Sequence, residues 1–206
     1  METTVWLTFV AAAFAISLSP GTAAIAAMSA GTQFGLARGW RLLPGLALGI
    51  STQMAVVAAG LGALIVASSL AFQVVKWLGV AYLAWLGWQQ WRAPARPLLA
   101  EGGTAAAGHG LLLRGWMINA LNPKGTVFML AVVPQFLDLA RPLLPQYLAL
   151  TATLCASEML VMAGYMALSA RVRGLLRTPR QMGVLNRVFG GLFIAAAALL
   201  ASFKRA

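Results

Sequence analysis

Charged residues are scarce in this 206-residue chain, and acidic residues are scarcer still. Aspartate and glutamate together number 4, charged residues make up 9% of the sequence, and hydrophobic residues make up 61%. Soluble domains usually carry about 25% charged residues. Residues 3–37 and 42–75 contain no charge at all, and each stretch exceeds the ~20 residues that one membrane-spanning helix needs. The composition predicts an all-α membrane protein and excludes a soluble domain.

Cysteine and histidine each occur once, as Cys155 and His109. A single cysteine excludes an intrachain disulfide bond. His109 lies outside the apolar stretches, so these stretches hold no histidine for a serine–histidine dyad or a metal-ligand cluster. A Walker-type phosphate-binding loop is also lacking, which excludes ATP as an internal energy source. We therefore expect no enzyme activity, no cofactor and no metal site.

The charge gaps predict six membrane-spanning helices, at 5–27, 42–66, 70–91, 112–136, 146–169 and 187–203. Of the 15 Lys and Arg residues, ten fall in the connections after the first, third and fifth helices, four fall on the opposite side, and Lys124 lies within a helix. Basic residues accumulate in cytoplasmic loops, so we expect a multi-pass protein of the bacterial cytoplasmic membrane with both termini outside. The net charge of +11 then sets orientation and does not indicate a nucleic-acid partner.

Two of these helices are interrupted at corresponding places. Ser19, Pro20 and Gly21 break the first, and Asn122 and Pro123 break the fourth; 103 residues separate the two prolines. Proline lacks the N–H of a helical hydrogen bond and clashes with the carbonyl four residues earlier. Paired breaks in two halves of a membrane protein mark a transporter's binding site. For either break alone, a kink solvated by nearby serine and asparagine side chains is the alternative.

The matching breaks predict a single membrane domain, 1–206, built from two repeats. Residues 1–92 form the first three-helix repeat, 93–110 form a cytoplasmic linker rich in proline and glycine, and 111–206 form the second repeat. Lys76 and Arg187 each precede a glycine by three residues and an aromatic residue by six, which supports a duplication. Because each repeat holds three helices, the two must be inverted relative to one another.

Glu158 is the acidic residue that lies deep within a predicted span. A carboxylate at the bilayer centre costs ~3 kcal/mol or more, so it must face the protein interior or water. Burial disfavours the charged form of a carboxyl group, which makes Glu158 a candidate proton carrier. A structural ion pair, or a carboxyl group that simply stays neutral, is the alternative.

Lys124 follows Pro123 at the start of a half-helix, where the ammonium group and the helix N-terminus would both attract a substrate carboxylate. A purely structural pair with Glu158 is the alternative. Pro20 and Pro123 would free the carbonyl groups of Ile16 and Asn119 to accept a substrate ammonium.

Three further residues stand out within the apolar stretches. Gln53 is a polar group in an apolar run and either lines a cavity or bonds to a neighbouring helix. Gly45 and Gly49 allow close approach of helices, either within one chain or in a homodimer.

The sequence resembles the lysine-exporter superfamily of bacterial amino-acid exporters, most closely its homoserine/homoserine-lactone efflux branch. The matching segments are 18–21, 76–87, 122–124, 134–136, 164–165 and 199–202. Glu158 stands where that branch carries an aspartate. The resemblance implies six helices and proton-driven export of amino acids or close derivatives. Two departures, Ala26 for an asparagine and Ala47 for a glutamine, suggest a less polar cavity and a substrate other than homoserine.

The sequence thus predicts a secondary exporter that works by alternating access and takes homoserine, its lactone, a threonine-like or another neutral amino acid. Its partners would be this substrate, protons and the lipid bilayer. A channel, an exporter of metal ions or another small solute, and a membrane module that does not transport are the alternatives.

Overall fold

The computed structural model describes residues 2–19, 21–67, 69–92, 110–171 and 179–202, and the regular elements in these ranges are all helical. They are α1 (Thr3–Leu18), α2 (Thr22–Gly39), α3 (Leu42–Ala67), α4 (Ser69–Trp91), α5 (Leu111–Ala120), α6 (Pro123–Val132), the 3-10 helix η2 (Val133–Phe136), α7 (Leu143–Arg171) and α8 (Pro179–Ser202). The expected all-α membrane protein is confirmed at this level. The inverted arrangement of two repeats stays a prediction.

Both expected helix breaks are present. The first apolar segment ends as α1 at Leu18 and resumes as α2 at Thr22, and the fourth ends as α5 at Ala120 and resumes as α6 at Pro123. The first segment continues beyond its expected end at residue 27, because α2 extends to Gly39, with a kink at Gly35, whose φ of 65° and ψ of −178° are not helical.

The helices vary in their ability to span a bilayer. Among the described residues, Leu42–Gly60 of α3 and the whole of α7 are long and apolar enough to cross a membrane. The pair α1 and α2, bent by 61°, makes a third crossing if it is one broken span. The number of six crossings therefore stays a prediction.

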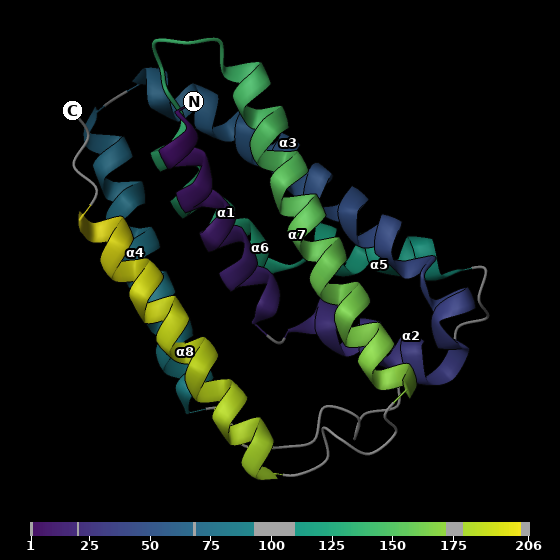
Figure 1. Cartoon of the computed structure of the whole chain (residues 1–206). Coiled ribbons are helices and arrows are strands. Elements are labelled where there is room, and N and C mark those ends of the chain that lie inside the picture. The colour runs from purple at the N-terminus through teal and green to yellow at the C-terminus, as the bar shows by residue number, and fades with distance from the viewer. Residues whose placement is uncertain (1, 20, 68, 93–109, 172–178, 203–206) are drawn as a thin grey trace.

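The helices pack in pairs, with α4 along α8, α3 along α5, and α2 along α7. Figure 1 shows the α4–α8 pair on one side of the molecule and the α3–α5 pair on the other. The start of α1 and the end of α8 lie at the same end of the molecule as the loop before α7 (Figure 1).

Glycine allows the closest of these contacts. A Cβ atom added to Gly115 of α5 would collide with the backbone of α3 at Leu42 and Leu46, and one added to Gly49 would lie 2.7 Å from the carbonyl oxygen of Trp116. Gly45 meets the backbone of α5 in the same way. The Gly45–Gly49 spacing therefore serves packing within the chain.

The buried side chains form two apolar clusters. One, which we call the outer cluster, joins α1, α3, α6, η2 and α7 and includes Phe9, Phe128, Phe136, Tyr147 and Leu150. The other joins α2, the start of α3, α5 and the end of α7, and is formed largely by alanine, leucine and methionine. The site described below lies between them, because residues of both clusters also line its cavity.

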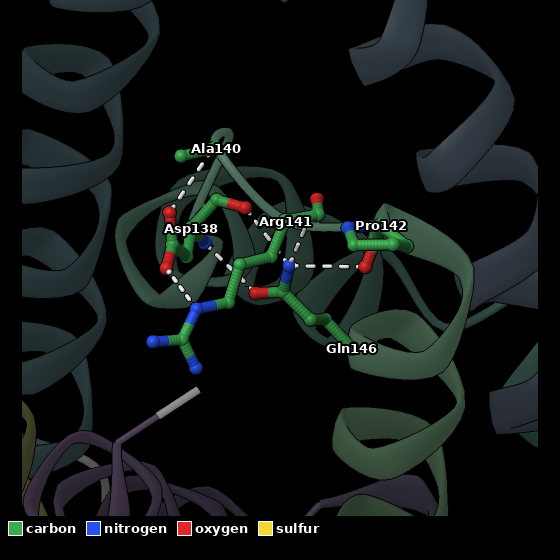
Figure 2. Close-up of polar contacts among 5 residues, drawn as sticks. All are labelled: Asp138, Ala140, Arg141, Pro142 and Gln146. Carbon is green, nitrogen blue, oxygen red and sulfur yellow. Dashed lines mark hydrogen bonds and ion pairs between the residues drawn. The ribbon is translucent and has the colours of Figure 1, made fainter.

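A buried glutamine organises the loop between η2 and α7 (Figure 2). The side chain of Gln146 accepts a hydrogen bond from Asp138 N at 2.8 Å and donates to Asp138 O, Arg141 O and Pro142 O at 2.8, 3.4 and 3.1 Å. Arg141 and Asp138 form an exposed ion pair at 3.1 Å. One side chain thus satisfies backbone groups that the turn leaves without helical partners.

Candidate functional site

A cavity of about 540 Å³ lies where the two broken helices meet. Residues from both breaks and from α3, α4 and α7 line it. Eight of the nine residues predicted for the site are among them: Ser19, Gly21, Gln53, Asn119, Asn122, Pro123, Lys124 and Glu158. The ninth, Pro20, lies outside the described residues. Residues 103 positions apart in the sequence therefore come together at one place.

Two half-helices begin at this cavity. Gly21 is extended, with φ −152° and ψ −165°, and is the N-cap residue of α2, which begins at Thr22. At α6, Pro123 occupies the first turn and the Asn122 side chain caps the helix by accepting from Lys124 N at 3.1 Å. Residues of both first turns line the cavity. Helix N-termini carry partial positive charge and unpaired N–H groups, so both ends make the cavity attractive to an anion.

Lys124 connects the two breaks. Its Nζ donates to Ser19 Oγ at 2.8 Å and to Ser19 O at 3.2 Å. These acceptors are neutral, and a carboxylate oxygen is a stronger acceptor for an ammonium group than either of them. The lysine therefore both joins α1 to α6 and offers a charge to an anion in the cavity.

Glu158 lies on α7 and is only 9% exposed. Its carboxyl group interacts with the side chains of Ser17 and Asn119 and with the charge of Lys124. Ser17 is further held by a 3.4 Å contact between its hydroxyl and that of Ser157. The cavity thus contains one acidic and one basic group at a site where two helix N-termini meet, which is an arrangement suited to a zwitterion.

Gln53 fulfils both of the roles that the sequence left open. It lines the cavity, and its Nε2 donates to Asn122 O and to Thr126 Oγ1, each at 2.7 Å. A Cβ atom at Gly125 would lie 2.8 Å from Gln53 Oε1, so glycine at that position lets the amide approach the break. Gln53 therefore fixes the start of α6 from the side of α3.

The backbone at the second break differs from the expectation. The carbonyl oxygen of Asn119 accepts from Asn122 N at 3.0 Å, so Pro123 does not leave it without a hydrogen bond. The Asn119 side chain donates to Leu46 O at 3.0 Å and interacts with Glu158. Asn119 therefore belongs to the site through its amide rather than through a freed carbonyl.

Two alanines that were expected to make the cavity less polar do not line it. Ala26 is buried in the cluster of α2, α3, α5 and α7. The carbonyl oxygen of Ala47 accepts from Ser51 and from the thiol of Cys155. Neither alanine therefore contributes to the cavity wall, and a preference for a more apolar substrate stays a prediction.

Sequence reasoning missed Tyr165 and the wall on α4. Tyr165 OH donates to Leu18 O at 2.8 Å, at the last residue before the first break. It stands seven residues after Glu158, which is two helical turns, and this spacing could have placed it on the same face. Tyr82, Trp85 and Gln89 of α4 also line the cavity, and their sequence offers no comparable signal.

The fold and the site together define an all-helical membrane protein with a central cavity at two helix breaks. The model of the family described as LysE type translocator matches residues 14–203. The chain therefore belongs to the LysE-type translocator family. Among the described residues, no group of three or more His, Cys, Asp and Glu side chains could hold a metal ion.

Relatives match the chain over nearly its whole length. A homoserine/homoserine lactone efflux protein of Salmonella typhimurium (strain LT2) is 40% identical over 202 residues, which is 98% of each chain. An uncharacterized membrane protein of Vibrio cholerae is 38% identical over 205 residues, covering 99% of this chain and 100% of its own. A leucine efflux protein of Enterobacter sp. (strain 638) is 31% identical over 198 residues, 95% of this chain and 94% of its own. No solved structure matches the chain.

Proposed function

We propose that the protein is a secondary exporter of neutral amino acids or close derivatives across the cytoplasmic membrane, working by proton antiport and alternating access. The observation that carries the proposal is the meeting of Lys124, Glu158 and two half-helix N-termini in one cavity. Membership of a translocator family and relatives named for homoserine and leucine efflux support it.

The two charges assign the two ends of the substrate. The α-carboxylate would bind at the start of α6, where Lys124 Nζ and the first-turn N–H groups meet it. The α-ammonium would lie against Glu158, whose carboxyl group faces the same cavity. Opposite charges held at fixed positions select a zwitterion and orient it, since reversing it would place like charges together.

Proton coupling follows from the same carboxyl group. A substrate ammonium stabilises the ionised form of Glu158, so binding from the cytoplasm favours release of its proton to that side. After the substrate leaves on the outer side, a proton taken up there neutralises Glu158. The empty site then returns to face the cytoplasm. Each cycle moves substrate outward and a proton inward.

Alternating access requires that the cavity be open to one side of the membrane at a time. On α4 and at the end of α5, three lining residues are partly exposed: Trp85 is 52%, Met117 47% and Leu121 74% exposed. The opposite end is filled by the outer cluster. In the predicted orientation, these exposed residues belong to the cytoplasmic half and the outer cluster faces outward.

The test is flux of labelled amino acids into liposomes that contain the purified full-length protein. An acidic vesicle interior should drive uptake, because protons leave as substrate enters. Glu158→Gln should lower the rate of this gradient-driven uptake at least tenfold. Glu2→Gln, a matched change at an exposed carboxyl group, should leave the rate unchanged. Flux that ignores the pH gradient would refute antiport, and no flux of any amino acid from folded protein would refute export.

A further inference from the structure

The cavity has two chemically different parts. Its polar part lies at the two helix breaks and on α3 and α7, where the groups described above gather. Further lining residues come from α4 and the end of α5. They are Tyr82, Trp85, Met117 and Leu121, and we call them together the α4–α5 wall. The proposed function gives no role to this wall.

The α4–α5 wall offers apolar contact area. The rings of Tyr82 and Trp85 lie 5.5 Å apart between centroids at an angle of 35°, so they form one broad surface. Met117 and Leu121 face the cavity from α5, and a methionine thioether adapts its shape to what it contacts. The polar Gln89 lines the cavity as well, but it is exposed at the cytoplasmic end of α4.

Two amide side chains of the polar part are already engaged within the protein. Both N–H groups of the Gln53 amide are used within the protein, on Asn122 O and Thr126 Oγ1. The Asn119 amide donates to Leu46 O and interacts with Glu158. A substrate hydroxyl buried beside groups that are already engaged lacks a partner and is penalised for it.

A charged substrate side chain would cost more free energy to bury in the cavity than a hydroxyl group. Among the described residues that line the cavity, Lys124 and Glu158 are the charged ones, and the proposed function uses both for the substrate's α-groups. A third charge in the cavity would be unpaired, which is costlier than an unpaired hydroxyl.

We infer that the α4–α5 wall is the subsite for the substrate's side chain, and that the preferred substrates are amino acids with bulky, uncharged, apolar side chains. The inference rests on the proposed function and narrows its substrate class. A cavity of 540 Å³ falls within the ~300–1,000 Å³ of ordinary ligand pockets, so it has room for a side chain as large as that of leucine or phenylalanine. Homoserine would leave the wall uncovered.

The experiment is competition in counterflow with liposomes that contain the full-length protein. Unlabelled leucine, methionine and phenylalanine would compete against labelled leucine, beside homoserine, threonine and lysine, and the same panel would be repeated against labelled homoserine. One methylene group in an apolar pocket changes selectivity about 10- to 200-fold, so we expect leucine to compete at least tenfold more effectively than homoserine. Trp85→Ala and Met117→Thr should each reduce that ratio at least fivefold.

Trp88→Ala is the matched control, because Trp88 lies on α4 but does not line the cavity. It should leave the leucine-to-homoserine ratio unchanged. The wild-type panel decides the inference even if a variant fails to fold. Stronger competition by homoserine, threonine or lysine would overturn the apolar subsite and leave the exporter standing. Absence of transport for every amino acid would overturn the proposed function, and this inference with it.

Discussion

In the proposed function, Lys124 has two roles that compete. Its bonds to Ser19 Oγ and Ser19 O hold the two helix breaks together, and its charge would also attract the substrate carboxylate. A carboxylate that enters the cavity competes with Ser19 for the same ammonium protons. Substrate binding would therefore loosen the connection between α1 and α6, and this is a physical route from binding to movement.

The first prediction concerns this lysine. Lys124→Met should raise the substrate concentration for half-maximal counterflow at least tenfold, because a hydrogen bond to a charged group contributes about 1.5–3 kcal/mol. Lys124→Arg keeps the charge and should recover part of the loss. Saturation curves of counterflow measure this. Equal half-saturation in wild type and Lys124→Met would show that the carboxylate binds elsewhere.

At the residue scale, the sequence was informative where a residue type is out of place. Proline in a helix, and lysine or glutamate in an apolar span, are costly, so Pro123, Lys124 and Glu158 could be identified in advance. Tyr82 and Trp85 could not. The cavity wall and the lipid both present apolar surroundings, so an aromatic residue on α4 looks the same whichever way it points.

At the scale of helices, the contact between α3 and α5 depends on glycine. Gly115 of α5 faces the backbone of α3 so closely that a side chain cannot fit without displacement. Membrane helices lack a strong hydrophobic drive to associate, so close backbone packing through small residues replaces it. The same contact positions Asn119, which lies one turn further along α5 and donates to Leu46 O.

The second prediction compares two glycines. Gly115→Ala should lower the free energy of unfolding by about 1–3 kcal/mol, as overpacking does. Gly164→Ala is the control, since a Cβ atom there meets nothing within 4 Å, and alanine should stabilise that helix by up to about 1 kcal/mol. Thermal unfolding in detergent micelles measures both. Equal stability of the two variants would show that α3 and α5 do not pack this closely.

The third prediction concerns the loop between η2 and α7 (Figure 2). Gln146→Leu removes the partner of four backbone groups and should destabilise the protein by about 2 kcal/mol or more, since unsatisfied buried groups cost about 1–3 kcal/mol each. Arg141→Ala removes only an exposed ion pair and should cost less than about 1 kcal/mol. The same unfolding assay separates them, and a larger loss for Arg141→Ala would contradict the assignment.

At the scale of the whole molecule, the sequence predicted the class, the two breaks and their meeting at a site. It could not predict which helices pair. Apolar residues lie all around α4, so no single face of this helix identifies α8 as its neighbour. Their contact is decided by shape, with Gly87 and Gly190 facing one another's backbone, and shape complementarity appears only in three dimensions.

In the proposed transport cycle, the outer cluster would be the barrier that a substrate must pass on its way out. Phe9 of α1 and Phe136 of η2 meet edge to face, with ring centroids 5.1 Å apart at 66°. Phe9 is fully buried. In the proposed cycle these rings must separate for the cavity to open outward, so weakening their contact should favour the outward-open state.

The fourth prediction follows from that barrier. Phe9→Ala should lower the substrate accumulation that a pH gradient sustains in liposomes, because a weaker seal lets substrate leak back, while counterflow continues. Phe→Ala in a core costs about 3–5 kcal/mol, so Phe9→Ala could also unfold the protein. Phe9→Leu keeps most of the side-chain volume and is the control, because its substrate accumulation should stay close to that of wild type. Leu7→Ala, on the exposed side of the same helix, should have no effect. If folded Phe9→Ala accumulates substrate as wild type does, the barrier lies elsewhere and the outer cluster serves only to hold the helices together.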